Sequence, residues 1–353
     1  MSKLAIIGAS YLQRPLVMRA KEMGIETICF AWAEGAVCRE VCDRFYPISI
    51  TEKEQILAIC REEKIDGVCT IASDIAAPTV AYIAEQMGLT GNRYEASLRA
   101  HDKHQMREVL TAAGIDCPRF LVVKSSEYKD KGLDFRDANF AFPLIVKPSD
   151  RSGSLAVARV ADQAALEAAV AQALEVSIAG EALIEEYIEG REISVEMISC
   201  RGTHYALQIT DKTTTGAPHF VELAHHQPSS LPAVTQDHIF AITRRALDAL
   251  GITNGASHSE YKITAEGRIV VMEIAGRMGG DFIGSDLVQI STGYDFLRGV
   301  IEVALGEEIK VETQPIAHSS VEFVAPENVS CSAERTGYRI YRNEQLVSEG
   351  KNG

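Results

Sequence analysis

Apolar runs and amphipathic stretches alternate along the first ninety residues. Short apolar segments bounded by small or polar residues predict β-strands at 4–8, 26–31 and 67–72. Apolar positions with helical spacing predict helices at 14–23, 52–63 and 76–87. Strands that alternate with helices in this way favour a parallel sheet covered by helices on both faces.

The pattern changes beyond residue 91. A connector at 91–101 leads into a predicted helix at 103–113, which Gly114 ends. An alanine-rich helix is expected at 163–174. Short apolar segments around that helix predict strands at 143–147, 154–160, 182–187 and 193–200. This mixture fits an α+β unit better than a continuation of the parallel sheet.

The last third of the chain continues this mixture. Strands are expected on both sides of the polar loop 211–218, and a helix is expected at 236–250. Two apolar segments joined by a turn-like Ala-Glu-Gly-Arg predict an antiparallel hairpin over 256–276. A helix at 294–305 then precedes a short tail, 316–353, with one or two strands.

The predicted hairpin carries two acidic residues, Glu260 and Glu273, on its two strands. Antiparallel pairing can bring both carboxylates onto one surface, and paired carboxylates suit Mg²⁺ when its other ligands are phosphate oxygens. Arg277, four residues further on, suits a site where phosphate charge develops. The hairpin is therefore interpreted as half of a site for ATP. The alternative is an ordinary hairpin with solvent-exposed acids.

A lysine stands at the end of the apolar strand 143–147. An uncompensated charge would be costly there, so Lys147 is expected to face an anion. The loop that follows contains Ser152, Gly153 and Ser154, which can offer backbone N–H groups and hydroxyls to phosphates. The alternative is a strand that simply ends in a surface turn, which is commoner for a Lys-Pro-Ser-Asp sequence seen alone.

Acidic residues gather between the strands 182–187 and 193–200. Glu185, Glu186 and Glu192 flank a Glu-Gly-Arg turn. Carboxylates can accept hydrogen bonds from a ribose diol, and the exposed backbone of a hinge can pair with an adenine edge. The alternative is a solvated acidic hairpin, the commoner case when one such segment occurs alone.

Composition narrows the classes of protein that fit. The net charge of −14, without a basic tract, argues against a general surface for nucleic acid or anionic membrane. The first segment has the pattern of a strand rather than a signal peptide, and no apolar run approaches the length of a membrane span. The eight cysteines form no CxxC pair, which disfavours a zinc site. A cytoplasmic protein is expected.

Five segments occur in a fixed order along the chain: the Lys103 helix, the Lys147 strand with its loop, the acidic hinge, the Glu260 strand and the Glu273–Arg277 segment. In this order they resemble the ATP-grasp superfamily of carboxylate–amine ligases, which includes amino-acid ligases. The resemblance implies a combined α/β and α+β fold. Its expected parts are a Rossmann-like parallel-sheet domain at 1–94, a two-lobed ATP-grasp domain at 95–315 with a mobile lid lobe at about 118–187, and a C-terminal tail at 316–353.

The resemblance also implies an adenosine site. Glu185 would reach the adenine amino group, and the backbone of Glu186 and Ile188 would pair with the ring. Glu192 would hold the ribose hydroxyls, and the loop 152–154 would cover the phosphates.

The same resemblance implies a reaction with ATP and Mg²⁺ as cofactors. Lys103 and Lys147 would contact the α- and β-phosphates, Glu260 and Glu273 would ligate Mg²⁺, and Arg277 would neutralise the transferred phosphoryl group. A small-molecule carboxylate, such as an amino acid, would form an acyl-phosphate and ADP. An amine would then displace phosphate. Catalysis would consist mostly of positioning and charge neutralisation.

One position departs from the family pattern Glu-x-Asn-x-Arg. Position 275 is alanine, which has no donor oxygen, so a water or another side chain must take the place of the asparagine. Activity is expected to survive, with weaker binding of a second Mg²⁺.

The residues that would bind the substrate are less clearly indicated by the sequence. The candidate residues are Lys212, His225, Gly280 and Ser285. Because relatives carry a larger C-terminal region, a homodimer that completes the acceptor pocket is one hypothesis. Two other functions fit the same fold: a ligase whose acceptor is a carrier protein, a peptide or a thiol, and a nucleotide-binding sensor without catalysis, which Ala275 alone supports.

Overall fold

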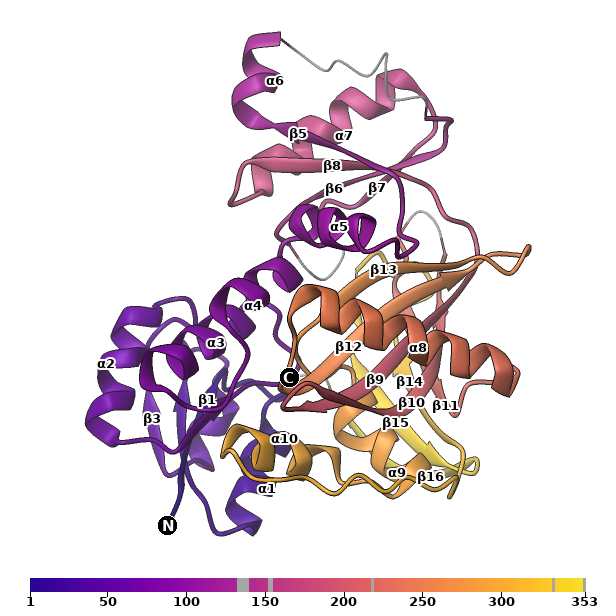
Figure 1. Ribbon diagram of the computed structural model, residues 1–353. Coiled ribbons are helices and arrows are strands. Elements are labelled where there is room, and N and C mark those ends of the chain that lie inside the picture. Colours follow the sequence, from indigo (N-terminus) through magenta and orange to yellow (C-terminus); the bar gives the residue numbers. More distant parts are fainter. Residues whose placement is uncertain (132–139, 152–154, 217–218, 332–333, 352–353) are drawn as a thin grey trace.

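The computed structural model describes residues 1–131, 140–151, 155–216, 219–331 and 334–351. Three β-sheets with their helices form an N-terminal unit, a smaller lobe and a large body (Figure 1). Within these residues, no helix is both long enough and apolar enough for a bilayer crossing.

The N-terminal unit is the four-stranded parallel sheet that the alternating pattern predicts, in the order β3-β2-β1-β4. Its elements are β1 (Lys3–Ile7), α1 (Arg14–Glu22), β2 (Glu26–Phe30), η1 (Val37–Glu40), β3 (Arg44–Tyr46), α2 (Lys53–Glu63), β4 (Gly67–Cys69) and α3 (Ala76–Met87). Because parallel strands run the same way, the loops that follow β1 and β4 lie together at one edge of the sheet.

Two helices lead out of this unit, α4 (Tyr94–His101) and α5 (Lys103–Ala112). The connector expected at 91–101 is therefore wrong, since most of it is the short helix α4. Asp102 separates the two helices, and its Oδ1 accepts a hydrogen bond from the Gln105 backbone N–H at 2.9 Å. This cap makes Lys103 the first residue of α5, and its backbone N–H donates to the Ser149 carbonyl at 2.9 Å.

The smaller lobe is an antiparallel sheet in the order β5-β8-β6-β7, with α7 packed on it (Figure 1). Its elements are β5 (Phe120–Lys124), α6 (Ser125–Lys131), β6 (Leu144–Pro148), β7 (Ala158–Val160), α7 (Gln163–Val176) and β8 (Glu181–Glu186). The strand expected at 154–160 is shorter than predicted, because β7 begins only at Ala158.

The body is an eight-stranded antiparallel sheet in the order β13-β12-β9-β10-β11-β14-β15-β16. Its elements are β9 (Arg191–Cys200), β10 (Thr203–Thr214), β11 (Glu222–Gln227), α8 (Ala233–Leu250), β12 (Gly255–Ile263), β13 (Ile269–Ala275), η2 (Ile283–Leu287), α9 (Val288–Thr292), α10 (Phe296–Ala304), β14 (Ser319–Val324), β15 (Gly337–Arg342) and β16 (Gln345–Lys351).

Two expectations for the body are wrong. The polar loop 211–218 is shorter than predicted, because β10 continues to Thr214 and pairs there with β11. The tail holds three strands rather than one or two, and β14 joins them to the main sheet beside β11.

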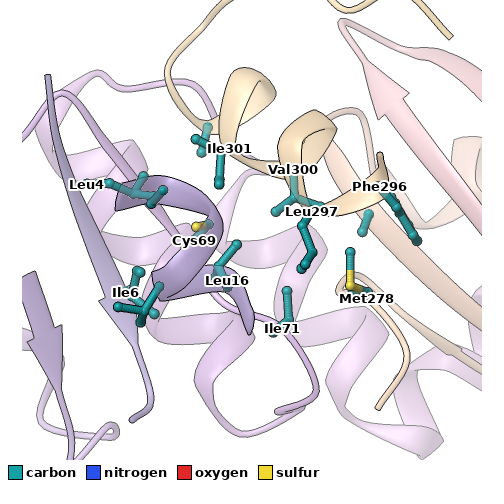
Figure 2. Packing of buried hydrophobic residues seen from close by; sticks show 14 of the residues in the cluster. Leu4, Ile6, Leu16, Cys69, Ile71, Met278, Phe296, Leu297, Val300 and Ile301 are labelled. Carbon is teal, nitrogen blue, oxygen red and sulfur yellow. The ribbon is translucent and has the colours of Figure 1, made fainter. Parts of the chain in front are cut away.

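A shared hydrophobic core joins the N-terminal unit to the body. Leu16 and Ile71 of the unit pack with Met278 and Phe296 of the body, and all four are at most 1% exposed (Figure 2). Burial of such side chains is worth roughly 1.5–3 kcal/mol each relative to exposure. The unit is therefore packed firmly against the body, and its loop after β4 lies beside the Arg277 segment.

Candidate active site

The two acids of the hairpin lie directly opposite each other. Glu260 on β12 is the register partner of Glu273 on β13, in the antiparallel hairpin that the sequence predicts. Side chains of directly opposed residues project from the same face, with Cβ atoms roughly 4.5–5.5 Å apart. The two glutamate side chains are 33% and 27% exposed, so both are accessible from the cleft beside them.

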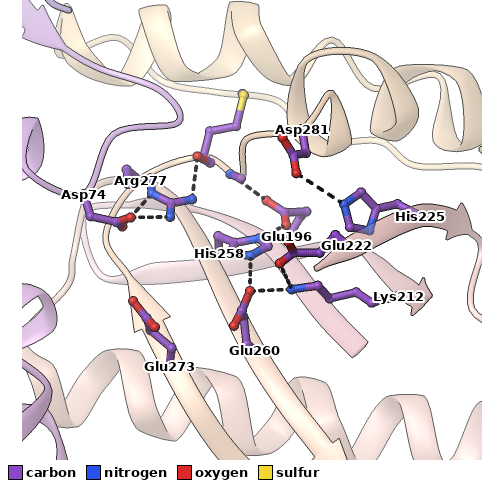
Figure 3. A network of polar contacts seen from close by, with 12 residues as sticks. Asp74, Glu196, Lys212, Glu222, His225, His258, Glu260, Glu273, Arg277 and Asp281 are labelled. Atoms are coloured by element: carbon purple, nitrogen blue, oxygen red, sulfur yellow. Dashed lines mark hydrogen bonds and ion pairs between the residues drawn. The ribbon is translucent and has the colours of Figure 1, made fainter. Parts of the chain in front are cut away.

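Each of these glutamates is paired with a lysine. Lys212 Nζ lies 2.6 Å from Glu260 Oε1, and Lys103 Nζ lies 3.4 Å from Glu273 Oε1 (Figure 3 shows the first pair). Burial lowers the pKa of Lys212, but Glu260 and Glu222 outweigh this effect and raise it above its ordinary value. Burial likewise raises the pKa of Glu260, and Lys212 reverses the shift. Both groups are therefore charged at neutral pH.

A second cluster of charges is fully buried at the base of the smaller lobe. Glu185 Oε2 lies 2.7 Å from Lys147 Nζ, and Glu185 Oε1 accepts a hydrogen bond from Arg107 Nε at 2.9 Å. Arg107 Nη2 also donates to the Met272 carbonyl at 2.6 Å. Burial raises the pKa of Glu185, but the two cations lower it below its ordinary value. The buried pair of Arg107 with Glu185 was not predicted from the sequence. Arg107 lies one helical turn from Lys103, and this spacing could have indicated that both side chains face the same region.

Lys147 and Glu185 line a cleft between the smaller lobe and the body. Lys103, Lys147 and Glu185 lie in its wall, together with Glu192, whose Oε1 is 3.1 Å from Lys262 Nζ. Apolar side chains complete it, namely Ile145, Val157, Ile193, Phe220 and Met272. Charged side chains outnumber apolar ones in this wall, and a concave wall with convergent charges is typical of a site for a charged small molecule.

Of the remaining residues expected at the nucleotide, two do not line this cleft and the others fall outside the described part of the chain. Glu186 directs its carboxylate to Arg119 and Arg268, at 3.0 and 3.1 Å. Ile188 is buried at 5% exposure. Ser152, Gly153 and Ser154 fall outside the described residues.

A second chamber adjoins the cleft on the side of the N-terminal unit. The two cavities share Lys212, Glu222, Glu260 and Glu273 in their walls. Arg277 lines the chamber, where Asp74 Oδ1 lies 2.7 Å from its Nε (Figure 3). The other residues that line it are Leu12, Ala72, Asp74, His225, His258, Ala275, Gly280, Asp281, Ile283 and Arg335.

The structure brings three of the four substrate candidates into this chamber. Lys212, His225 and Gly280 line it, whereas Ser285 does not, and its hydroxyl donates to Asp286 Oδ2 at 2.6 Å. His225 is 1% exposed, and burial lowers the pKa of its imidazole despite Asp281 Oδ2 at 3.8 Å.

A histidine stands opposite the position where the family carries asparagine. His258 is the register partner of Ala275, its Nε2 lies 3.4 Å from Glu260 Oε1, and its Nδ1 contacts the buried carboxylate of Glu196. Burial lowers the pKa of His258, but Glu196 more than offsets this and raises it to about 9. His258 was not predicted from the sequence. Its position two residues before Glu260 places both side chains on the same face of β12, and this spacing could have indicated a role for His258.

Two further residues at the far end of the chamber were also missed. Arg335 donates to both carboxylate oxygens of Asp281, at 2.7 and 2.9 Å, and its guanidinium lies 3.9 Å from the ring centre of Phe323. Arg335 belongs to the segment between β14 and β15. The segment between β14 and β15 therefore contributes Arg335 to the wall of the chamber.

The donor set fits a magnesium–nucleotide complex. Among the described residues, no three His, Cys, Asp or Glu side chains form a metal cage. Glu260 and Glu273 carry carboxylate oxygens of the kind that Mg²⁺ binds, and the lysine contacts described above use only Oε1 of each. Mg²⁺ is commonly bound by one or two carboxylates, with substrate phosphates and water completing the octahedron.

Comparisons with known proteins agree with this geometry. Residues 140–286 match the ATP-grasp domain. The chain is 27% identical over 251 residues to an alanine–anticapsin ligase of Bacillus subtilis (strain 168), with 64% of this chain and 51% of the relative covered. It thus spans about half the length of that relative. A D-alanine–D-alanine ligase of Pseudomonas entomophila is 27% identical over 271 residues, with 72% and 81% covered.

A crystal structure supplies a comparison over nearly the whole chain. The L-amino acid ligase from Bacillus licheniformis superposes with a TM-score of 0.79 at 25% identity, with 93% of this chain and 81% of that chain covered. The fold, the order of the motifs and these matches agree: residues 140–286 match an ATP-grasp domain, and the chain is similar to amino-acid ligases over most of its length.

Proposed function

We propose that this protein is an ATP- and Mg²⁺-dependent carboxylate–amine ligase that releases ADP and phosphate. The observation that carries the proposal is the wall shared by the two cavities. Lys212, Glu222, Glu260 and Glu273 face both the cleft and the chamber. A nucleotide in the cleft would thus present its terminal phosphate to a carboxylate in the chamber.

In this proposal the cleft holds ATP. Lys103 and Lys147 bind the phosphates, and Glu192 holds the ribose with Lys262 beside it. The backbone of Glu186 and Ile188 pairs with adenine. Both carboxylate oxygens of Glu185 are already paired, one with Arg107 and the other with Lys147. In this proposal Glu185 contacts the adenine amino group while it keeps both pairs. The region 118–187 acts as the mobile lid lobe of an ATP-grasp domain at 95–315, which follows the domain 1–94 and precedes the tail 316–353.

The chemistry takes place where the cavities meet. A carboxylate oxygen of the substrate attacks the γ-phosphorus of ATP, the bond to the β,γ-bridging oxygen breaks, and an acyl-phosphate and ADP result. An amine nitrogen then attacks the acyl carbon, the C–O bond to phosphate breaks, and the amine loses a proton. Arg277 neutralises the charge on the transferred phosphoryl group. Mg²⁺ on Glu260 and Glu273 would neutralise phosphate oxygens.

An amino acid is the proposed carboxylate substrate. The three relatives described above are, by name, ligases of alanine with anticapsin, of D-alanine with D-alanine, and of L-amino acids. The chamber offers Lys212, His225 and Gly280 to such a molecule, and its small apolar side chains, Ala72 and Ala275, suit a compact one. A cytoplasmic location and a homodimer stay predictions.

The direct test is an assay of ADP and phosphate release from ATP and Mg²⁺ across a matrix of amino-acid pairs. Release that depends on one pair supports the proposal and names the substrates. AMP with pyrophosphate would overturn the acyl-phosphate route. ATP binding without turnover by any pair would favour a carrier, peptide or thiol acceptor, or a nucleotide sensor.

A further inference from the structure

Arg277 is oriented by a residue from the other end of the fold. Asp74 lies between β4 and α3 of the N-terminal unit, 203 positions from Arg277 in the chain. Its Oδ1 accepts from Arg277 Nε at 2.7 Å and its Oδ2 accepts from Nη2 at 2.8 Å (Figure 3). The two side chains are 16% and 12% exposed, so the pair lies largely out of solvent.

This pairing determines which donors Arg277 presents to the chamber. A guanidinium has five N–H groups in a rigid plane. Asp74 takes two of them and the Met278 carbonyl takes a third, from Nη1 at 3.1 Å. No hydrogen bond within the described residues uses the other two. Because the bidentate contact includes Nε, it fixes the plane of the group and the direction of these two donors.

The loop that carries Asp74 is itself docked against the Arg277 segment. Ile71 forms a parallel bridge with Met278, and the Ala72 backbone N–H donates to the Met278 carbonyl at 3.1 Å. Ala72 has a φ of 57°, an uncommon conformation for a residue with a side chain. Such strain persists where the surrounding contacts demand it, and it is common at functional sites.

We propose that Asp74 is a positioning residue for the ligase reaction, through which the N-terminal unit sets the orientation of Arg277. The inference rests on the proposed function, since it assigns the two remaining N–H groups of Arg277 to the transferred phosphoryl group. In this proposal Asp74 affects the reaction only through Arg277, because it sets the orientation of the Arg277 guanidinium. A carboxylate that only tied two parts of the fold together would not control the chemical step.

The kinetic test compares Asp74→Asn with Asp116→Asn on the substrate pair that supports ADP release. Asp116 forms the same kind of bidentate pair with Arg268, at 2.7 and 2.7 Å, away from both cavities. Misplacing a reacting group by about 1 Å can cost roughly 100-fold in rate, so kcat of Asp74→Asn is expected to fall by about that factor. The KM for ATP should change less than about threefold, and Asp116→Asn should resemble the wild type.

The variant Asp74→Glu separates position from charge. It keeps the carboxylate but shifts it by one methylene, so it should lose most of the rate as well. A kcat within about threefold of the wild type in Asp74→Asn, or full rate in Asp74→Glu, would overturn the proposal.

A second measurement does not depend on turnover. The Nε–H resonance of Arg277, identified by its loss in Arg277→Lys, should exchange slowly with water in the wild type and in Asp116→Asn. Exchange should be at least about tenfold faster in Asp74→Asn, because the acceptor at Nε is weakened. Exchange in the wild type as fast as that of an exposed arginine would overturn the positioning role. Absence of ligase activity in the wild type would instead refute the proposed function.

Discussion

The charged side chains around the two cavities are held by opposite charges. Lys103 pairs with Glu273, Lys212 pairs with Glu260, and Lys147 pairs with Glu185. Removing charge from water is costly unless a partner replaces the solvent. These pairs therefore hold the charged side chains in fixed positions before the substrates bind, which electrostatic catalysis requires.

At this scale, Glu273→Ala should abolish most turnover. The loss removes one proposed Mg²⁺ ligand, so kcat should fall by at least about 100-fold. The fold should stay intact, because the Glu273 side chain is 27% exposed and Lys103 Nζ still donates to the Arg151 carbonyl at 2.8 Å. Glu266→Ala in the turn of the same hairpin is the matched control, and steady-state phosphate release is the measurement. Full activity of Glu273→Ala would contradict the metal assignment.

Glu192→Ala should act on nucleotide binding rather than on chemistry. Loss of the proposed ribose contact should raise the KM for ATP roughly tenfold, since hydrogen bonds to a charged group are worth about 1.5–3 kcal/mol. The kcat should change little. An unchanged KM in initial-rate measurements would argue against the ribose role.

The sequence indicated the pairing of Glu260 with Glu273, because an antiparallel hairpin with a short turn determines its own register. The sequence did not indicate Asp74, Asp281 or Arg335. Their partners lie far away in the chain, and no local pattern records such contacts. Ser285 was predicted at the substrate from its place in the sequence, but its side chain does not line the chamber and bonds to Asp286 instead.

At the scale of elements, α5 links the smaller lobe to the body. Its Arg107 joins Glu185 of β8 to the carbonyl of Met272 in β13. Long amphipathic patterns predicted α3, α7 and α8 well, because many residues contribute to each. The short elements α4, β3 and β5 were missed, since three to eight residues carry too little periodicity and tertiary packing determines their structure.

Glu185→Gln should destabilise this junction. It leaves Lys147 and Arg107 without their counter-ion, at a cost of about 3–5 kcal/mol at pH 7. The pKa of Glu185 is lower in the folded state than its ordinary value. The stabilisation that its charge provides is therefore complete at pH values above the ordinary pKa, and it is lost as the pH falls through the folded-state pKa. Urea unfolding should thus show a difference between wild type and variant that shrinks below about pH 4.

The exposed Glu175→Gln on α7 is the control for that experiment and should unfold like the wild type. A difference between Glu185→Gln and the wild type that grows on acidification would contradict the assigned sign.

At the scale of the whole molecule, the N-terminal unit and the body work as one packed structure. Phe296 of α10 is fully buried in their shared core. Phe296→Ala should reduce the free energy of unfolding by about 3–5 kcal/mol. Val234→Ala, at a side chain that is 76% exposed, should change it by less than about 0.5 kcal/mol in the same denaturant titration. Equal effects of the two changes would contradict the shared core.

In the proposed reaction, a substrate carboxylate takes the terminal phosphate of ATP. The decisive measurement uses a carboxylate substrate with ¹⁸O at both carboxylate oxygens, turned over with ATP, Mg²⁺ and the matching amine. One ¹⁸O atom is expected in the released phosphate for every ADP formed. Unlabelled phosphate, or label in AMP, would exclude the acyl-phosphate route.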